Sequence, residues 1–102
     1  MQSFSILVLI FERIEKRLQS HELGKAQQEV SSALRYDSKN YFAKALKRRL
    51  SSIMHIGRNS QQSFYMRNSS FERTMTALQH LCQMARKSII QQHTGELEMN
   101  DE

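Results

Sequence analysis

Apolar residues recur at alternating steps of three and four positions near the start of the chain, which is the pattern of one buried stripe on an α-helix. The spacing continues into a charged stretch, where a β-strand would require alternation of period two. A strand at residues 6–11 is therefore the weaker interpretation. The pattern predicts a helix at residues 3–20 with the buried stripe Phe4, Leu7, Phe11, Ile14 and Leu18.

Three further segments have helical spacing and predict helices at residues 23–36, 41–56 and 70–92. Residues 37–40 separate two of them and predict a turn, because Asp, Ser and Asn side chains compete for backbone amides. The three buried faces are expected to contain Leu23, Ala26, Val30, Ala33 and Leu34; Phe42, Ala45 or Leu46, Leu50 and Ile53; and Phe71, Met75, Leu78, Cys82, Ala85 and Ile89.

Two segments lack this pattern. Residues 57–69 are mostly Ser, Asn, Gln and Arg around the isolated pair Phe64 and Tyr65, which predicts a long polar loop. A loop of this length is either a functional surface or the place where a helix has been lost or shortened. Residues 94–102 are expected to form a flexible acidic tail, because their charged side chains are Glu96, Glu98, Asp101 and Glu102.

The elements predict an all-α fold of antiparallel helical hairpins, with about four helices closed by a long C-terminal one. The length of 102 residues leaves room for one domain, which we place at residues 1–93. With 39% apolar residues the chain is too apolar to be disordered throughout. Its single cysteine, Cys82, makes no internal disulfide, so a reducing compartment, the cytoplasm, is expected.

The segments at residues 3–20 and 41–56 overlay at an offset of 36 residues, which suggests an internal repeat: Leu7, Ile10, Ile14 and Leu18 fall on Ala43, Leu46, Leu50 and Met54. Between them, small and bulkier apolar residues alternate before the turn at residues 37–40. This order resembles the second helix and inter-repeat turn of a tetratricopeptide repeat. The chain departs from that family at Val30, where an aromatic residue is usual, at Ser38, where Pro is usual, and in lacking the Trp and Leu-Gly pair.

The resemblance covers about residues 7–54 and implies a non-enzymatic module that holds a protein or peptide on a curved helical surface. Such folds usually need three or more repeats, and this chain has room for two at most. It is then a piece of a longer protein, a domain capped by its own last helix, or a subunit that completes its core by self-association.

The first predicted helix has more apolar surface than one neighbouring helix covers, which favours a homodimer. The alternative is that the other helices together surround it. The apolar run is too short to span a membrane, so no membrane-spanning segment is expected, although a peripheral membrane contact at residues 4–11 stays open. The apolar interface would contain Ile6, Val8, Leu9 and Ile10, with Phe64 and Tyr65 of the loop as further apolar contacts.

Positive charge is concentrated in the middle of the sequence. The net charge is +5, and no acidic residue lies between Asp37 and Glu72. A basic ridge on the third helix and the following loop is therefore expected to bind an acidic protein or, as the alternative, nucleic acid, with Phe64 and Tyr65 stacking on bases. A simply solvated face is the third interpretation. The ridge consists of Lys44, Lys47, Arg48, Arg49, Arg58 and Arg67.

Catalytic chemistry has little support in the sequence. The four histidines are far apart, and Cys82 lies on an apolar stripe with no predicted base beside it. Neither a metal-ligand spacing nor a Gly-rich phosphate loop occurs. We therefore expect no enzyme activity, no metal and no cofactor.

Overall fold

The computed structural model describes the backbone of residues 3–57 and 69–100, and the side chains of residues 6–54 and 71–93. This described part is all-α, which confirms the predicted fold class. Its helices are α1 (Ser3–Gln19), α2 (Leu23–Tyr36), α3 (Tyr41–Gly57) and α5 (Ser69–Asn100). The bounds of α1, α2 and α3 agree with the sequence predictions to within one residue.

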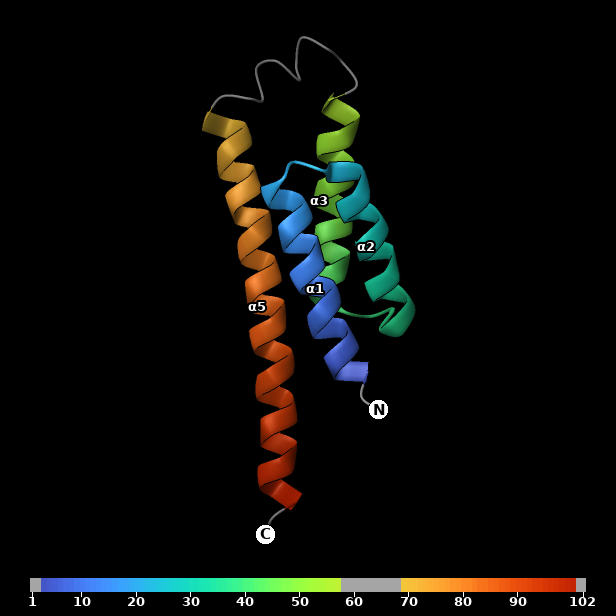
Figure 1. Cartoon of the computed structure of the whole chain (residues 1–102), viewed down its shortest axis with the longest axis vertical. Helices are drawn as coiled ribbons and strands as arrows, with labels where there is room; N and C mark the ends of the chain where they lie inside the picture. Colours follow the sequence, from blue (N-terminus) through green and yellow to red (C-terminus); the bar gives the residue numbers. More distant parts are fainter. Residues whose placement is uncertain (1–2, 58–68, 101–102) are drawn as a thin grey trace.

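The four helices pack in a cyclic order within the described part of the chain. Each of α1 and α3 contacts both α2 and α5, whereas α1 and α3 do not approach each other, nor do α2 and α5. Neighbouring helices run in opposite directions (Figure 1). The arrangement is that of an up-and-down four-helix bundle, in which each helix buries one stripe toward a shared centre.

The core is formed by the apolar stripes that the sequence spacing predicts. On α3 the buried face is rotated slightly from the expected one, because Ala43 is fully buried while Phe42 is only half-buried. Each fully buried Leu, Ile or Phe side chain contributes roughly 1.5–3 kcal/mol relative to exposure. The buried residues are Leu7, Ile10, Phe11, Ile14, Leu18, Ala26, Val30, Ala33, Ala43, Leu46, Leu50, Ile53, Met75, Leu78, Cys82 and Ala85.

The turn between α2 and α3 is fixed by side chains, as residues 37–40 predict. The backbone amide of Ala43 donates to Asn40 Oδ1 over 2.9 Å, so Asn40 caps the N-terminus of α3. Asp37 accepts from the backbone amide of Lys39 at 3.3 Å and from the Asn40 side chain at 3.3 Å. These bonds set the direction in which α3 leaves α2.

The end of α1 is a Schellman-type cap built without glycine. Glu22 N donates to Arg17 O at 2.8 Å, and His21 N donates to Leu18 O at 3.0 Å. His21 has φ of 60°, a left-handed conformation that is unusual for a residue other than Gly or Asn. Its ring meets Phe71 of α5 edge-on, with centroids 5.5 Å apart, so the strained residue also contacts the last helix.

The last helix does not end near Gln92, as the spacing predicts, but continues to Asn100 and so includes most of the predicted acidic tail at residues 94–102. Gly95 is the one strong helix breaker in the stretch, and a single Gly costs only about 1 kcal/mol relative to Ala. The neighbouring Glu, Leu and Met residues favour the helix. α5 consequently extends past the ends of the other three helices (Figure 1).

Candidate functional site

A shallow depression of about 610 Å³ lies between the C-terminal half of α2 and the N-terminal half of α3. Three of its lining side chains are cationic and belong to the basic ridge that the sequence predicts. The lining also includes two hydroxyl side chains and one partly buried leucine. We call this surface the α2–α3 basic depression; its residues are Leu34, Ser38, Lys44, Lys47, Arg48 and Ser51.

Helical spacing brings the three cations to one side of α3. Lys44, Lys47 and Arg48 are at positions i, i+3 and i+4, and all three are exposed. The opposite side of α3 is held in the core by Leu46 and Leu50. The exposed cations of α3 are thus separated from the side chains that stabilise the fold.

A polar contact between α2 and α3 fixes one edge of the depression. Gln27 Nε2 donates to Ser51 Oγ over 2.8 Å and lies 3.5 Å from the backbone carbonyl oxygen of Lys47. Ala33 of α2 and Ala43 of α3 are both fully buried, and such small side chains allow close packing of helices. The two walls of the depression are therefore held at a defined separation.

The positive charge of the α2–α3 basic depression is not neutralised by the residues around it. None of its lining residues is acidic. Among the described residues, Lys44, Lys47 and Arg48 form no ion pair. A partner that supplies carboxylates or phosphates would meet these cations without first displacing an internal partner.

A second basic cluster provides a contrast. Arg13, Lys16, Arg17, Ser20 and Glu22 line a depression of about 360 Å³ at the C-terminal half of α1. Here the guanidinium groups have acidic partners: Arg13 Nε lies 3.1 Å from Glu29 Oε1, and Arg17 Nη1 lies 3.0 Å from Glu22 Oε1. Most of the positive charge in this cluster is compensated within the chain.

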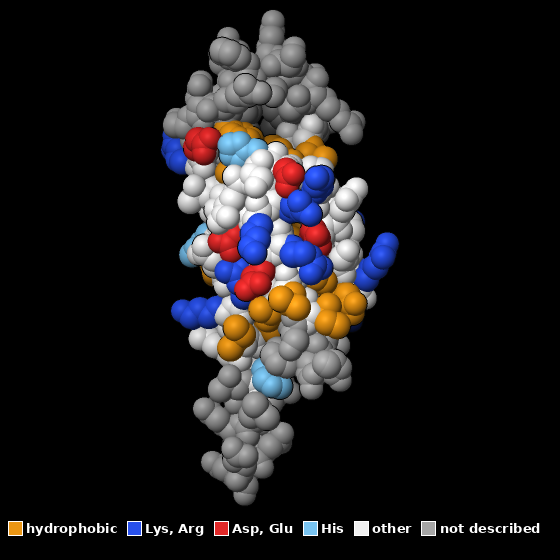
Figure 2. Space-filling view, viewed as in Figure 1, with side chains coloured by type: hydrophobic (Ala, Val, Ile, Leu, Met, Phe, Trp, Pro, Cys, Tyr) orange, Lys and Arg blue, Asp and Glu red, His pale blue; other side chains and the backbone are white. Residues whose placement is uncertain are grey.

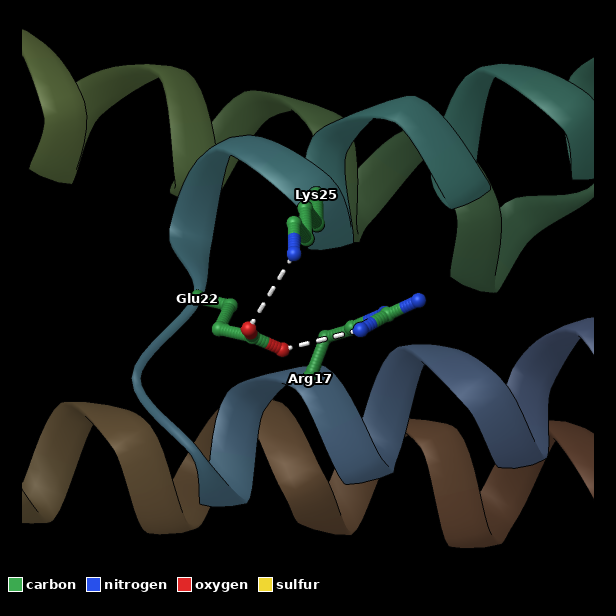
Figure 3. Close-up of polar contacts among 3 residues, drawn as sticks. All are labelled: Arg17, Glu22 and Lys25. Atoms are coloured by element: carbon green, nitrogen blue, oxygen red, sulfur yellow. Dashed lines mark hydrogen bonds and ion pairs between the residues drawn. The ribbon is translucent and has the colours of Figure 1, made fainter.

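Glu22 sits between two cations at the α1–α2 turn (Figure 3). Besides Arg17, it contacts Lys25, whose Nζ lies 3.4 Å from Glu22 Oε2. The hydrogen bond from Arg17 is the main reason that the pKa of the Glu22 carboxyl is below its ordinary value of 4.5, and Lys25 lowers it further. Glu22 therefore stays ionised at neutral pH and connects the two helices.

Three further residues, Arg49, Arg58 and Arg67, belong to the predicted basic ridge. Arg49 is exposed on α3 but does not line the α2–α3 basic depression. Arg58 and Arg67 lie outside the described residues, as do Phe64 and Tyr65. Of the predicted ridge, the described residues therefore place Lys44, Lys47 and Arg48 at the α2–α3 basic depression.

The predicted apolar interface on α1 needs one correction. Ile10 is only 1% exposed and belongs to the core, because α5 and α2 enclose α1 from both sides. Ile6 packs against the core and Val8 is half-buried, whereas Leu9 is 52% exposed. Figure 2 shows apolar side chains gathered in the lower part of the described surface, below a region where acidic and basic side chains alternate.

The structure places the single cysteine of the chain in an unreactive setting. Cys82 is buried between helices, and desolvation is the main cause that raises the pKa of its thiol to about 12, with the Glu15 carboxylate raising it further. Such a thiol is protonated and poorly nucleophilic at neutral pH. Within the same residues, no group of three His, Cys, Asp or Glu side chains is placed to hold a metal ion.

Sequence spacing alone missed several residues of this surface. Leu34 is predicted in the core, but it also forms part of the depression. Ser38 lies in the α2–α3 turn and Ser51 lies on α3. Tyr41 is 72% exposed and lies on the same side of α3 as Lys44 and Arg48, at spacings of three and seven. The spacing of Tyr41 from Lys44 and Arg48 is therefore the sequence signal that could have placed Tyr41 beside these cations.

Among the described helices, none has the length and apolar character needed to cross a membrane.

Comparisons with known proteins assign no family to the chain. No family model matches the sequence, and no curated protein or solved structure matches it either.

Proposed function

We propose that the chain is a non-enzymatic protein-interaction module that binds an acidic helix or peptide at the α2–α3 basic depression. The observation that carries this proposal is the contrast between two basic surfaces. Arg13 and Arg17 of the α1 cluster pair with Glu29 and Glu22, whereas Lys44, Lys47 and Arg48 form no ion pair among the described residues, and no residue that lines their depression is acidic. The tetratricopeptide-like resemblance of residues 7–54 supports the same class of function.

The chemistry of the depression suggests what its ligand contains. Lysine and arginine bind carboxylates, and their spacing suits acidic side chains that recur at three and four positions along a helix. Leu34 offers a small apolar contact, and the hydroxyl groups of Ser38 and Ser51 accept or donate hydrogen bonds. The proposed ligand is therefore an acidic segment with at least one apolar residue. The compartment that we propose for the chain is the cytoplasm.

Nucleic acid is a second candidate because of Tyr41. An exposed aromatic ring beside Lys44 and Arg48 is the combination with which proteins stack bases and contact phosphates in single strands. The two ligands differ in salt dependence: binding that neutralises several phosphates weakens steeply as salt is added, whereas an apolar anchor lessens that dependence for a peptide.

The test is a titration of two fluorescent probes followed by anisotropy at two salt concentrations. One probe is a synthetic helical peptide with Glu at positions i, i+3 and i+4 and an adjacent Leu; the other is a single-stranded DNA oligonucleotide. We expect the peptide to bind, and a variant carrying Lys44→Glu, Lys47→Glu and Arg48→Glu to bind it at least about tenfold more weakly, since like charges then face each other.

A matched control separates this surface from net charge. Lys16→Glu, Arg73→Glu and Lys87→Glu change three exposed cations on α1 and α5 and alter the net charge by the same amount. Surface changes of this kind usually alter stability by no more than about 0.5 kcal/mol, and circular dichroism would verify the fold of both variants. Equal loss of peptide binding in both variants would contradict the proposal, and preferential binding of the oligonucleotide would support the second candidate.

A further inference from the structure

The chain carries an acidic segment whose charge is opposite to that of the α2–α3 basic depression. Lys87 is the last Lys or Arg in the sequence, and every ionised side chain after it is acidic apart from the titratable His93. The acidic residues are Glu96, Glu98, Asp101 and Glu102, with Leu97 and Met99 between them. This composition is the one that the depression requires of its ligand: carboxylates together with an apolar residue.

The part of this segment that belongs to α5, residues 96–100, extends past the other helices. α5 has 32 residues and α1 has 17, so at a rise of about 1.5 Å per residue α5 is nearly twice as long. Figure 1 shows the last turns of α5 continuing beyond the start of α1 and the α2–α3 turn. The C-terminal turns of α5 are thus presented to other molecules.

The geometry of the bundle keeps this segment away from the depression of its own copy. Within the described residues, α2 makes no contact with α5, and these two helices occupy opposite positions in the bundle. α5 runs as one continuous helix to Asn100, directed away from the other helices (Figure 1). Returning to Leu34 or Lys44 would require α5 to break, so a second molecule is the simpler source of an acidic occupant.

We propose that the acidic C-terminal segment of a second copy of the chain, residues 96–102, occupies the α2–α3 basic depression. This inference rests on the proposed function, because it names a partner for the same site. The donor segment and the acceptor surface are different parts of the molecule, so the contact is heterologous. Two copies can make this contact reciprocally and form a dimer, or successive copies can make it in one direction and form a longer oligomer. Its strength falls as salt screens the charges.

Two charge-reversed variants of the full chain test the contact. The first reverses the acceptor with Lys44→Glu, Lys47→Glu and Arg48→Glu. The second reverses the donor with Glu98→Lys, Asp101→Lys and Glu102→Lys. In sedimentation velocity at low ionic strength, we expect the wild type to self-associate and each variant alone to associate at least about tenfold more weakly.

Mixing the variants provides the decisive readout. In an equimolar mixture the intact acidic donor meets the intact basic acceptor, and the reversed basic donor meets the reversed acidic acceptor, so we expect association to return. The variant with Lys16→Glu, Arg73→Glu and Lys87→Glu should associate like the wild type. Because recovery on mixing requires both variants to be folded, it also excludes misfolding as the cause of the individual losses.

Three outcomes would overturn this inference. They are a wild type that is monomeric at low salt and high concentration, a mixture that does not associate, and self-association that persists in both variants but is lost on Leu9→Lys. The last result would assign self-association to the apolar surface of α1. If the wild type is monomeric but still binds the acidic peptide at the depression, the self-contact is wrong and the proposed function stands.

Discussion

Glu15 of α1 and Arg86 of α5 form an ion pair across the largest helix interface, with Arg86 Nη1 2.7 Å from Glu15 Oε1. The contact is close but is not aligned as a hydrogen bond. Gln83 Nε2 donates to the other carboxylate oxygen, Oε2, over 2.8 Å. With side chains only 12% and 22% exposed, Glu15 and Arg86 fix α5 against α1 in a poorly solvated setting.

Removal of one partner of this pair should destabilise the bundle more than removal of both. Arg86→Leu leaves the Glu15 carboxylate largely shielded from water without its cation, and we expect a loss of about 1–3 kcal/mol in unfolding free energy. Adding Glu15→Leu should recover part of that loss. Urea unfolding of both single variants and the double variant measures the coupling, and strictly additive effects would contradict a functioning ion pair.

Ala33 tests the close packing of α2. Its side chain is fully buried, so Ala33→Leu inserts three extra carbon atoms into a filled space and should cost about 1–3 kcal/mol. Ser31→Leu makes a comparable addition at an exposed position of the same helix and should change stability by no more than about 0.5 kcal/mol. Equal melting temperatures for the two variants would rule out the packing described for Ala33.

Glu22 gives a prediction about pH. Its carboxyl has a lowered pKa in the folded chain, so the folded state is favoured by ionisation, and this stabilisation is present above the ordinary value of 4.5. It is lost as the pH falls through the lowered pKa. We therefore expect Glu22→Gln to reduce the melting temperature at pH 7 but not at a pH below that pKa. A difference that persisted under acidic conditions would contradict the role of the Arg17 contact.

Cys82 should be inert while the chain is folded. Burial and a thiol pKa of about 12 keep the thiolate fraction very small at pH 8, so a thiol-specific reagent should react only through unfolded molecules. The labelling rate should rise sharply in urea at concentrations that unfold the chain. Rapid stoichiometric labelling without urea would contradict this prediction, because it would show that the packing around Cys82 opens readily in the folded chain.

The sequence pattern was sufficient to predict most of the fold. The three-and-four spacing through Leu7, Ile14 and Leu18 placed α1, and the Asp37 and Asn40 side chains identified the turn before α3. Spacing on a single helix could not show which side a neighbour would cover. Ile10 was therefore assigned to an outer surface, although α2 and α5 enclose it. The end of α5 was missed because its apolar stripe ends earlier than its helix-forming residues.

The site was only partly predictable for a related reason. Lys44, Lys47 and Arg48 share one helix, so their spacing alone brought them together. Leu34 and Ser38 come from the neighbouring segment, and their place beside the cations depends on how α2 and α3 pack. The compensation of Arg13 by Glu29 likewise joins residues from different helices, and this pairing is what distinguishes the two basic surfaces.

We propose that the α2–α3 basic depression is the recognition surface of this chain. Its most direct test is to titrate the isotopically labelled wild type with the acidic helical peptide and follow backbone amide chemical shifts by NMR. We predict shift changes concentrated at Leu34, Ser38 and residues 44–51, with little change along the exposed side of α1. Changes centred on Arg13 and Arg17, or on Leu9, with none at residues 44–51 would contradict the account.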